Sequence, residues 1–363
     1  MDRETFNPRL EGLRGLAALA VCGHHGMSAF SDGSTPTILG WLLYAFNPAA
    51  AVMFFFVLSG YVLGCAIERD SNFVGYITRR FFRLVPPFVF SVLFAFACVT
   101  LVRIDPMPFG LTDFFQRPFW PQPTLDQLSD NLILRSSWIN GPTWSIWPEL
   151  VGSFFLPVLV WLHRSTSPRS QWLLFVGLST AIAFSPLRLL FWFYAGFFLA
   201  KKIGDFLTGR NFLALPVFVV GFVFLRAVAE HAVYYKTATV FPSAIAAALM
   251  IGSVISSQSF MRWTELPPVR FLGRVSFSFY LLHWPIFYLC AMLAVACRPV
   301  IAVGNVGILL LTIATTLIAA AISYQYVEIP AIRSGKYLSG LLRSPVESMA
   351  RRWRAVFRSQ GSA

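Results

Sequence analysis

The residues in this sequence most able to do chemistry are ionisable side chains inside long apolar segments. Arg14 and His25 lie 11 residues apart in the first such segment. Eleven helical residues make three turns plus about 20°, so both side chains share one helix face, about 16 Å apart along the axis. An ionisable group deep in a bilayer is costly, so His25 is predicted to be functional rather than a hydrogen-bonded core residue. His24 points about 80° away from Arg14, and for it the two interpretations are equally good.

A second group of residues suits the binding of anions and the handling of protons. Arg80 and Arg83 are i,i+3 neighbours that project together from a helix, which suits bidentate phosphate binding. Anchoring at the cytoplasmic surface explains them equally well. Glu149 begins a later apolar segment, where it could share a proton with an imidazole or serve only as a first-turn acid favoured by the helix dipole. Trp144 and Ser145 precede it and are predicted to lie on the outer side.

Polar residues near the ends of other apolar segments carry weaker signals. Ser59 closes the run FFFVLS and, with the glycine that follows, could simply allow close helix packing. Tyr280 and His283 share a face at i,i+3, near the predicted cytoplasmic end of their helix. His283 is therefore expected far from His25, in donor-side contacts or a structural role rather than in shared catalysis. Glu328 is expected to pair with an arginine of the inner side.

The composition places these residues in a membrane protein. Hydrophobic residues make up 56% of the 363 residues and charged residues only 12%, against about 25% charged residues in soluble domains. Too few charges remain to coat a soluble globule, so much of the surface must face lipid. The net charge of +13 lies in short stretches between apolar segments, which is typical of cytoplasmic loops and excludes a nucleic-acid-binding face. The five cysteines form no CxxC pair, so neither a metal site nor a disulfide framework is expected.

Apolar segments long enough to cross a bilayer predict the architecture. We expect an all-α polytopic membrane protein with about ten transmembrane helices. They are predicted at residues 13–30, 46–67, 84–102, 146–162, 171–186, 187–200, 212–228, 240–256, 277–297 and 303–325. Most of the 29 Lys and Arg residues then lie on the side of the N-terminus, so both termini are predicted to be cytoplasmic. Residues 1–330 would form the transmembrane domain, and the basic tail at 331–363 a cytoplasmic segment suited to an amphipathic helix on the inner leaflet.

Taken in order, these segments resemble the membrane-bound acyltransferase family 3, the multi-spanning O-acyltransferases of extracytoplasmic glycans and related acceptors. The matching pieces lie between residues 9 and 330, about nine-tenths of the chain. They are Arg14-x10-His25, the FFFVLSGY run that contains Ser59, Arg80-Phe-Phe-Arg83 before two prolines, Trp144-Ser145 with Glu149, Ser276 with Tyr280 and His283, and Tyr326 with Glu328 and Pro330. The length matched predicts the stand-alone form of the family, without the hydrolase-like domain that some members append.

The resemblance implies a reaction and a role for each group. An acyl donor such as acetyl-CoA would approach from the cytoplasm, as a co-substrate rather than a tightly bound cofactor, and a hydroxyl acceptor would lie on the other side. His25 would be the essential imidazole, acting as general base or as transient acyl carrier. Arg14, Arg80 and Arg83 would neutralise the donor phosphates, with Tyr280 and His283 also on the donor side. Glu149 would assist the acceptor, with Trp144 and Ser145 beside it. The protein would then be a multi-pass protein of the cytoplasmic membrane.

Two other classes of function stay open at this stage. A secondary transporter of a lipid-linked glycan or small solute would use intramembrane His and Glu residues as proton relays. Inverted repeats with broken helices would favour a transporter, and the sequence contains none that we recognise. A structural or docking protein would need His25 and Arg80 for stability alone. The sequence does not determine the acceptor, the acyl chain or the oligomeric state.

Overall fold

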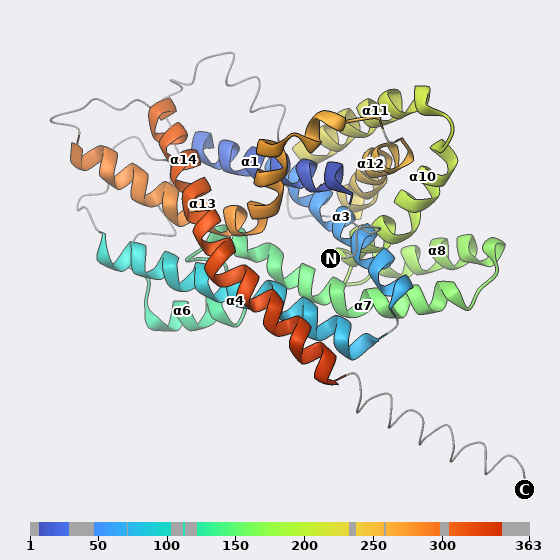
Figure 1. Cartoon of the computed structure of the whole chain (residues 1–363), viewed down its shortest axis with the longest axis horizontal. Coiled ribbons are helices and arrows are strands. Elements are labelled where there is room, and N and C mark those ends of the chain that lie inside the picture. The colour runs from blue at the N-terminus through green and yellow to red at the C-terminus, as the bar shows by residue number, and fades with distance from the viewer. Residues whose placement is uncertain are drawn as a thin grey trace, which may run out of the picture.

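The computed structural model describes residues 7–28, 47–70, 72–102, 112, 122–231, 237–257, 259–297 and 305–342. Over these ranges every regular element is a helix (Figure 1). The first half contains α1 (Pro8–Ser28), α3 (Pro48–Arg69), α4 (Phe73–Leu101), α6 (Leu125–Leu132), the short 3₁₀ helix η1 (Gly141–Ser145), α7 (Ile146–Arg164) and α8 (Pro168–Ala183). The second half contains α9 (Leu190–Ala195), the π-helical turn η2 (Gly196–Ala200), α10 (Lys201–Leu207), α11 (Asn211–Glu230), α12 (Thr237–Ser256), the 3₁₀ helix η4 (Arg262–Glu265), α13 (Pro267–Cys297), α14 (Asn305–Ser323) and the π-helical turn η5 (Tyr324–Glu328).

Each of the ten predicted segments coincides with helical residues, but not every helix is of the same kind. In the part of the chain that the structure describes, seven helices are long and apolar enough to cross a membrane. The other three segments correspond to α1, which carries three charges in its first seven residues, to α8, which has 16 residues, and to the broken α9–α10 stretch. The all-helical class and the membrane-spanning character are thus confirmed, and the count of ten stays a prediction.

Glycines bring α3 and the α9–η2 stretch together at the centre of the bundle. A side chain at Gly60 would run into the backbone of Phe193, and one at Gly196 into the carbonyl of Val57. The two helices therefore meet backbone to backbone, a contact that small residues permit in membrane bundles. The close-packing interpretation of the sequence around Ser59 is correct for the glycine beside it.

Helices α1 and α13 lie side by side and run in the same direction. Arg14 of α1 contacts Ser276 of α13, and His25, further along α1, contacts His283, further along α13. Gly15 lies against the backbone of Gly273, where a larger residue would collide. This parallel pairing gives corresponding positions of α1 and α13 nearly the same depth in the bundle.

The last helix is continuous from Val306 to Leu342 through the turn η5. In Figure 1 it is the long red helix that crosses α4, and Arg79 of α4 donates a hydrogen bond to Ser339 at 3.2 Å. The predicted division at residue 330 therefore falls inside a helix rather than at a break. The predicted amphipathic tail lies mostly at 343–363, outside the described residues.

Replacement of Gly60 by alanine tests the close packing of α3. We expect Gly60→Ala to destabilise the protein by about 1–3 kcal/mol, because the added methyl group collides with backbone that cannot move out of the way. Thermal unfolding in detergent would measure this as a lowered midpoint. Gly177→Ala is the matched control, since nothing lies within 4 Å of a side chain at Gly177. An unchanged midpoint in Gly60→Ala would contradict the packing.

Candidate functional site

Two histidines from the parallel helices α1 and α13 form the centre of the candidate site. Nδ1 of His25 lies 2.9 Å from Nε2 of His283, and the two rings stack with their centroids 5.2 Å apart at 16°. The ring of Trp284 meets His25 edge-on at 5.2 Å and 83°. Among the described residues, no three His, Cys, Asp or Glu side chains gather as a set of metal ligands. The two imidazoles thus form a hydrogen-bonded pair with the ring of Trp284 beside it.

This pairing corrects the prediction that His283 would lie far from His25. The prediction started the helix of His283 at residue 277, whereas α13 begins ten residues earlier, at Pro267. His283 is 16 residues into α13 and His25 is 17 residues into α1, so at 1.5 Å per residue both lie about 25 Å from the starts of their helices. Because the helices run parallel, the two imidazoles meet.

Tyr280 contacts His283 of the histidine pair, and its predicted role in donor binding stays a prediction. Its backbone carbonyl lies 2.6 Å from Nδ1 of His283. Its hydroxyl donates a hydrogen bond to the carbonyl of Pro142 at 3.1 Å, which attaches the segment before α7 to α13. Tyr280 therefore links the histidine pair to the chain that covers it.

Asn140 is a part of the site that the sequence analysis missed. Pro285 has no N–H, so the carbonyl of Leu281, four residues earlier, lacks its helical donor. The side-chain amide of Asn140 replaces that donor at 3.0 Å and also donates to Ser91 of α4 at 3.2 Å. Gly141 next to it lies against the ring of Trp284. A proline inside an apolar helix was the available signal, because it requires a donor from elsewhere.

Arg14 and Glu328 are held in the same region of α13, one helical turn or more before the histidine. Arg14 donates to the hydroxyl of Ser276 at 2.9 Å and to the carbonyl of Gly273 at 2.8 Å. Glu328, fully buried at the end of η5, accepts from Ser278 at 3.1 Å and lies 3.8 Å from Arg83. The predicted pairing of Glu328 with an arginine is confirmed. That Arg14 and His25 both contact α13 confirms that they share one face.

Glu149 forms a buried ion pair with Arg80 and accepts a hydrogen bond from Ser59 at 2.9 Å. The side chains of Arg80 and Glu149 are only 10% and 13% exposed. Arg80 also donates to Ser153, one turn after the acid. Glu149 was predicted at the acceptor end and Arg80 at the donor end, but the structure brings the two side chains into contact. The reason is that α4 begins at Phe73 and not at residue 84, so Arg80 lies inside the bundle. Proton sharing between Glu149 and an imidazole stays a prediction.

The three arginines of this region lie close enough to repel one another. Arg80 is within electrostatic range of Arg83 and Arg14, and Arg14 of Arg83. Among the described residues, Glu149 and Glu328 pair with two of them, and Glu11 is within electrostatic range of Arg14 and Arg83. We call these three arginines the basic cluster. Guanidinium groups gathered inside an apolar bundle suit the binding of an anion such as phosphate.

The remaining predicted residues lie apart from the histidine pair. His24 is within electrostatic range of Arg226 of α11 and so faces a different helix from His25. Trp144 packs edge-on against Phe56 of α3, with ring centroids 6.2 Å apart. Ser145 is buried and donates to a carbonyl within its own turn. Their contacts are those of packing residues, and an acceptor-side role for Trp144 and Ser145 stays a prediction.

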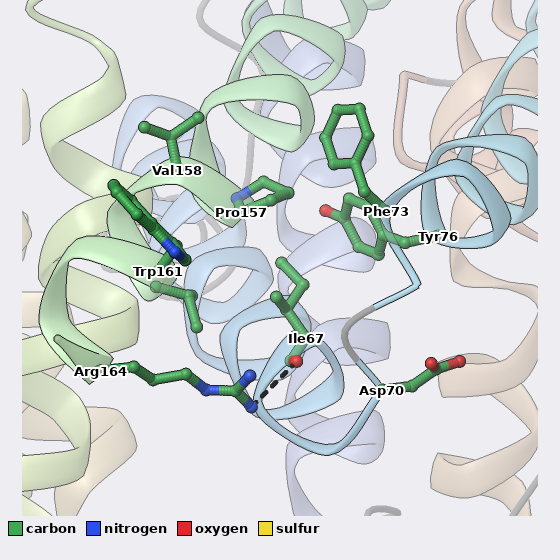
Figure 2. Close-up of a pocket in the computed structure, with 9 residues that line it drawn as sticks. Ile67, Asp70, Phe73, Tyr76, Pro157, Val158, Trp161 and Arg164 are labelled. Carbon is green, nitrogen blue, oxygen red and sulfur yellow. Dashed lines mark hydrogen bonds between the residues drawn. The ribbon is translucent and has the colours of Figure 1, made fainter. Parts of the chain in front are cut away.

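A cavity of about 290 Å³ lies between the ends of α3, α4 and α7 (Figure 2). Figure 2 shows Arg164 at one rim, where it donates to the carbonyl of Ile67, and Asp70 at the other. The walls between them are mostly apolar and include Trp161 and Tyr76. None of the predicted site residues lines this cavity, so its size alone does not identify the site. The candidate site residues lie mainly on α1, α13 and the first half of α4, with Glu149 of α7 and Glu328 of η5 beside them.

The fold and these contacts define a helical integral membrane protein with an imidazole pair and a basic cluster in its interior. The chain belongs to acyltransferase family 3: the model of this family, described as an acyltransferase domain, matches residues 7–324. All residues of the histidine pair and the basic cluster lie within the matched range.

Three curated proteins are similar to this chain in sequence. Acyltransferase MdmB of Streptomyces mycarofaciens is 29% identical over 49% of this chain and 46% of its own length. Peptidoglycan O-acetyltransferase OatA of Listeria monocytogenes is 22% identical over 91% of this chain and 56% of its own length. The putative peptidoglycan O-acetyltransferase YrhL of Bacillus subtilis is 26% identical over 91% and 55%. This chain thus spans about half the length of these relatives. No solved structure matches.

A pair of substitutions tests the buried ion pair between α4 and α7. Glu149→Leu alone should destabilise the protein by about 3–5 kcal/mol, because it leaves the Arg80 charge buried without its partner. Adding Arg80→Met should recover most of that loss, since a matched apolar pair removes both charges. Unfolding in detergent compares the three proteins. A single variant as stable as the wild type would show that the pair is not buried as described.

Proposed function

We propose that this chain is an O-acyltransferase that moves an acyl group, with acetyl as the default, from acyl-CoA to a hydroxyl of a glycan or related acceptor. Membership of acyltransferase family 3 supports the reaction class. The observation that carries the proposal is the histidine pair: His25 is partly exposed, and the buried His283 holds it through one ring nitrogen. A partly exposed imidazole with a fixed orientation suits general-base or nucleophilic catalysis.

The reacting nitrogen is Nε2 of His25, because Nδ1 is engaged with His283. As general base, Nε2 takes the proton of the acceptor hydroxyl while the acceptor oxygen bonds to the thioester carbonyl carbon. The carbon–sulfur bond then breaks, and the CoA thiolate takes the proton back from Nε2. As acyl carrier, Nε2 itself attacks the thioester and releases CoA, and the acceptor oxygen then displaces the imidazole. Both routes end with an ester and free CoA.

The basic cluster is proposed to bind the phosphates of the donor. Arg14 lies 11 residues before His25 on α1, about 16 Å along the axis. The thioester of acyl-CoA lies at the end of a long pantetheine arm, so the phosphates and the reacting carbonyl need sites well apart. Guanidinium groups suit phosphate because they donate in a planar fork. The donor is a co-substrate in this proposal and not a resident cofactor.

The acceptor is proposed to lie on the opposite side of the membrane from the donor. Two relatives are named as peptidoglycan O-acetyltransferases, one of them as putative, which supports a cell-envelope glycan as the acceptor class. The distribution of Lys and Arg supports cytoplasmic termini and a location in the cytoplasmic membrane. The acyl group would then pass through the bundle while CoA stays on the cytoplasmic side.

Substitution of the imidazole tests the reaction. Purified protein in liposomes would be given acetyl-CoA with and without glycan acceptors, and release of free CoA thiol would be measured. We expect His25→Ala to abolish release and His24→Ala, which changes the neighbouring ring, to retain it. A burst of about one thiol per protein without acceptor in the wild type would favour the acyl-carrier route, because general-base hydrolysis by water would continue beyond one turnover. Full transfer by His25→Ala would overturn the proposed chemistry, and solute flux would then be the next measurement.

Conservative replacement in the basic cluster tests donor binding. Arg83→Lys keeps the positive charge beside Glu328 but removes the planar fork. We expect the KM for acetyl-CoA to rise about tenfold with kcat nearly unchanged, because the lost contact stabilises bound donor and transition state alike. Steady-state thiol release at several donor concentrations gives both constants. A fall in kcat at unchanged KM would place Arg83 outside the donor site.

A further inference from the structure

We infer that His283 is a positioning residue that fixes the tautomer of His25. One ring nitrogen of His283 donates to a backbone carbonyl of α13, so its other nitrogen must accept a hydrogen bond from His25. The catalytic use of that tautomer rests on the proposed function, whereas the tautomer itself follows from the geometry. Neither the family match nor the relatives assign a role to this second histidine.

The first step is the hydrogen bond between His283 and Tyr280. A carbonyl oxygen only accepts hydrogen bonds, so Nδ1 of His283 must carry a proton to lie 2.6 Å from the Tyr280 oxygen. A neutral imidazole has one N–H and one lone pair. The Nε2 atom of neutral His283 is therefore an acceptor.

The second step passes this requirement to His25. The acceptor Nε2 of His283 lies 2.9 Å from Nδ1 of His25, so that nitrogen must be the donor of the pair. The proton of neutral His25 is thus on Nδ1, and the lone pair is on Nε2. The arrangement also tolerates a protonated His25, because an imidazolium donates from both nitrogens.

The third step is the difference in burial between the two rings. His283 is only 1% exposed, whereas His25 is partly exposed. The stacking of the rings at 16° and the edge of Trp284 restrict rotation of His25. The inner ring is therefore suited to orient and the outer ring to react. Because a carbonyl, and not a carboxylate, orients the pair, the fold avoids burying a negative charge beside it.

Nitrogen NMR of the full chain tests the tautomer directly. The protein would be labelled with ¹⁵N-histidine in detergent or nanodiscs, and the ring signals of His25 assigned by their loss in His25→Ala. We expect a protonated Nδ1 and a pyridine-like Nε2 at His25 in the wild type. Finding the proton on Nε2 of wild-type His25 would overturn the inference, whatever the enzyme does.

Two replacements of His283 separate positioning from packing. His283→Gln keeps one donor for the Tyr280 carbonyl and one acceptor for His25, whereas His283→Leu keeps neither. We expect His283→Gln to retain the wild-type tautomer and most of the activity. His283→Leu should lose the defined tautomer and lower kcat by about 10- to 100-fold, as is typical when an orienting partner is removed, with the KM for acetyl-CoA unchanged.

The outcomes also distinguish this inference from the proposed function. Equal activity and equal NMR signals in the Gln and Leu variants would overturn the positioning role while leaving His25 as the reacting group. Full activity of His25→Ala would overturn the catalytic proposal, while the tautomer in the wild-type spectrum would still be tested. A His283→Leu protein that does not fold leaves the wild-type and His283→Gln spectra as the deciding measurements, because each contains the predicted tautomer or contradicts it.

Discussion

The cost of burying polar side chains without partners is the constraint on which this structure depends. Neither lipid nor an apolar helix face can replace water as a hydrogen-bonding partner. Arg80 therefore meets Glu149, and Glu328 meets Arg83 and a serine. Each of these contacts joins different helices, so satisfying the polar groups also determines which helices are neighbours. The few charged side chains inside the apolar bundle are thus the ones that connect its helices.

The parallel contact of α1 and α13 keeps Arg14 and His25 apart along one pair of helices. Arg14 is held near the start of α13, and His25, the proposed reacting residue, is held further along the same helix. The proposed donor has a similar arrangement, because the anionic phosphates and the acyl group of acyl-CoA lie at opposite ends of one flexible molecule. A rigid pair of helices, brought close by Gly15 against Gly273, keeps that spacing constant.

Irregular turns in the helices create the polar contacts of the site. Pro285 removes a helical donor, and Asn140 supplies another from the chain that covers the site. The π-helical turn η5 ends at the buried Glu328, and such turns are frequent at functional sites because they shift the side chains that follow. The regular parts of the helices provide the apolar frame. The break at Pro285 and the turn η5 supply the hydrogen bonds of Asn140 and Glu328 to α13, to residues that lie shortly before His283 in the chain.

The sequence by itself determined the helical membrane class, the positions of the ten apolar segments, the shared face of Arg14 and His25, and the arginine partner of Glu328. It placed His283 far from His25 and Glu149 far from Arg80, because hydropathy starts a helix where the uninterrupted apolar residues start. Arginines interrupt the first ten or so residues of α4 and α13, so both helices begin about ten residues earlier than hydropathy indicates. The depth of a side chain in the bundle depends on where its helix begins. Only the tertiary structure decided which imidazole meets which, because that depends on the direction and register of helices more than 200 residues apart in the chain.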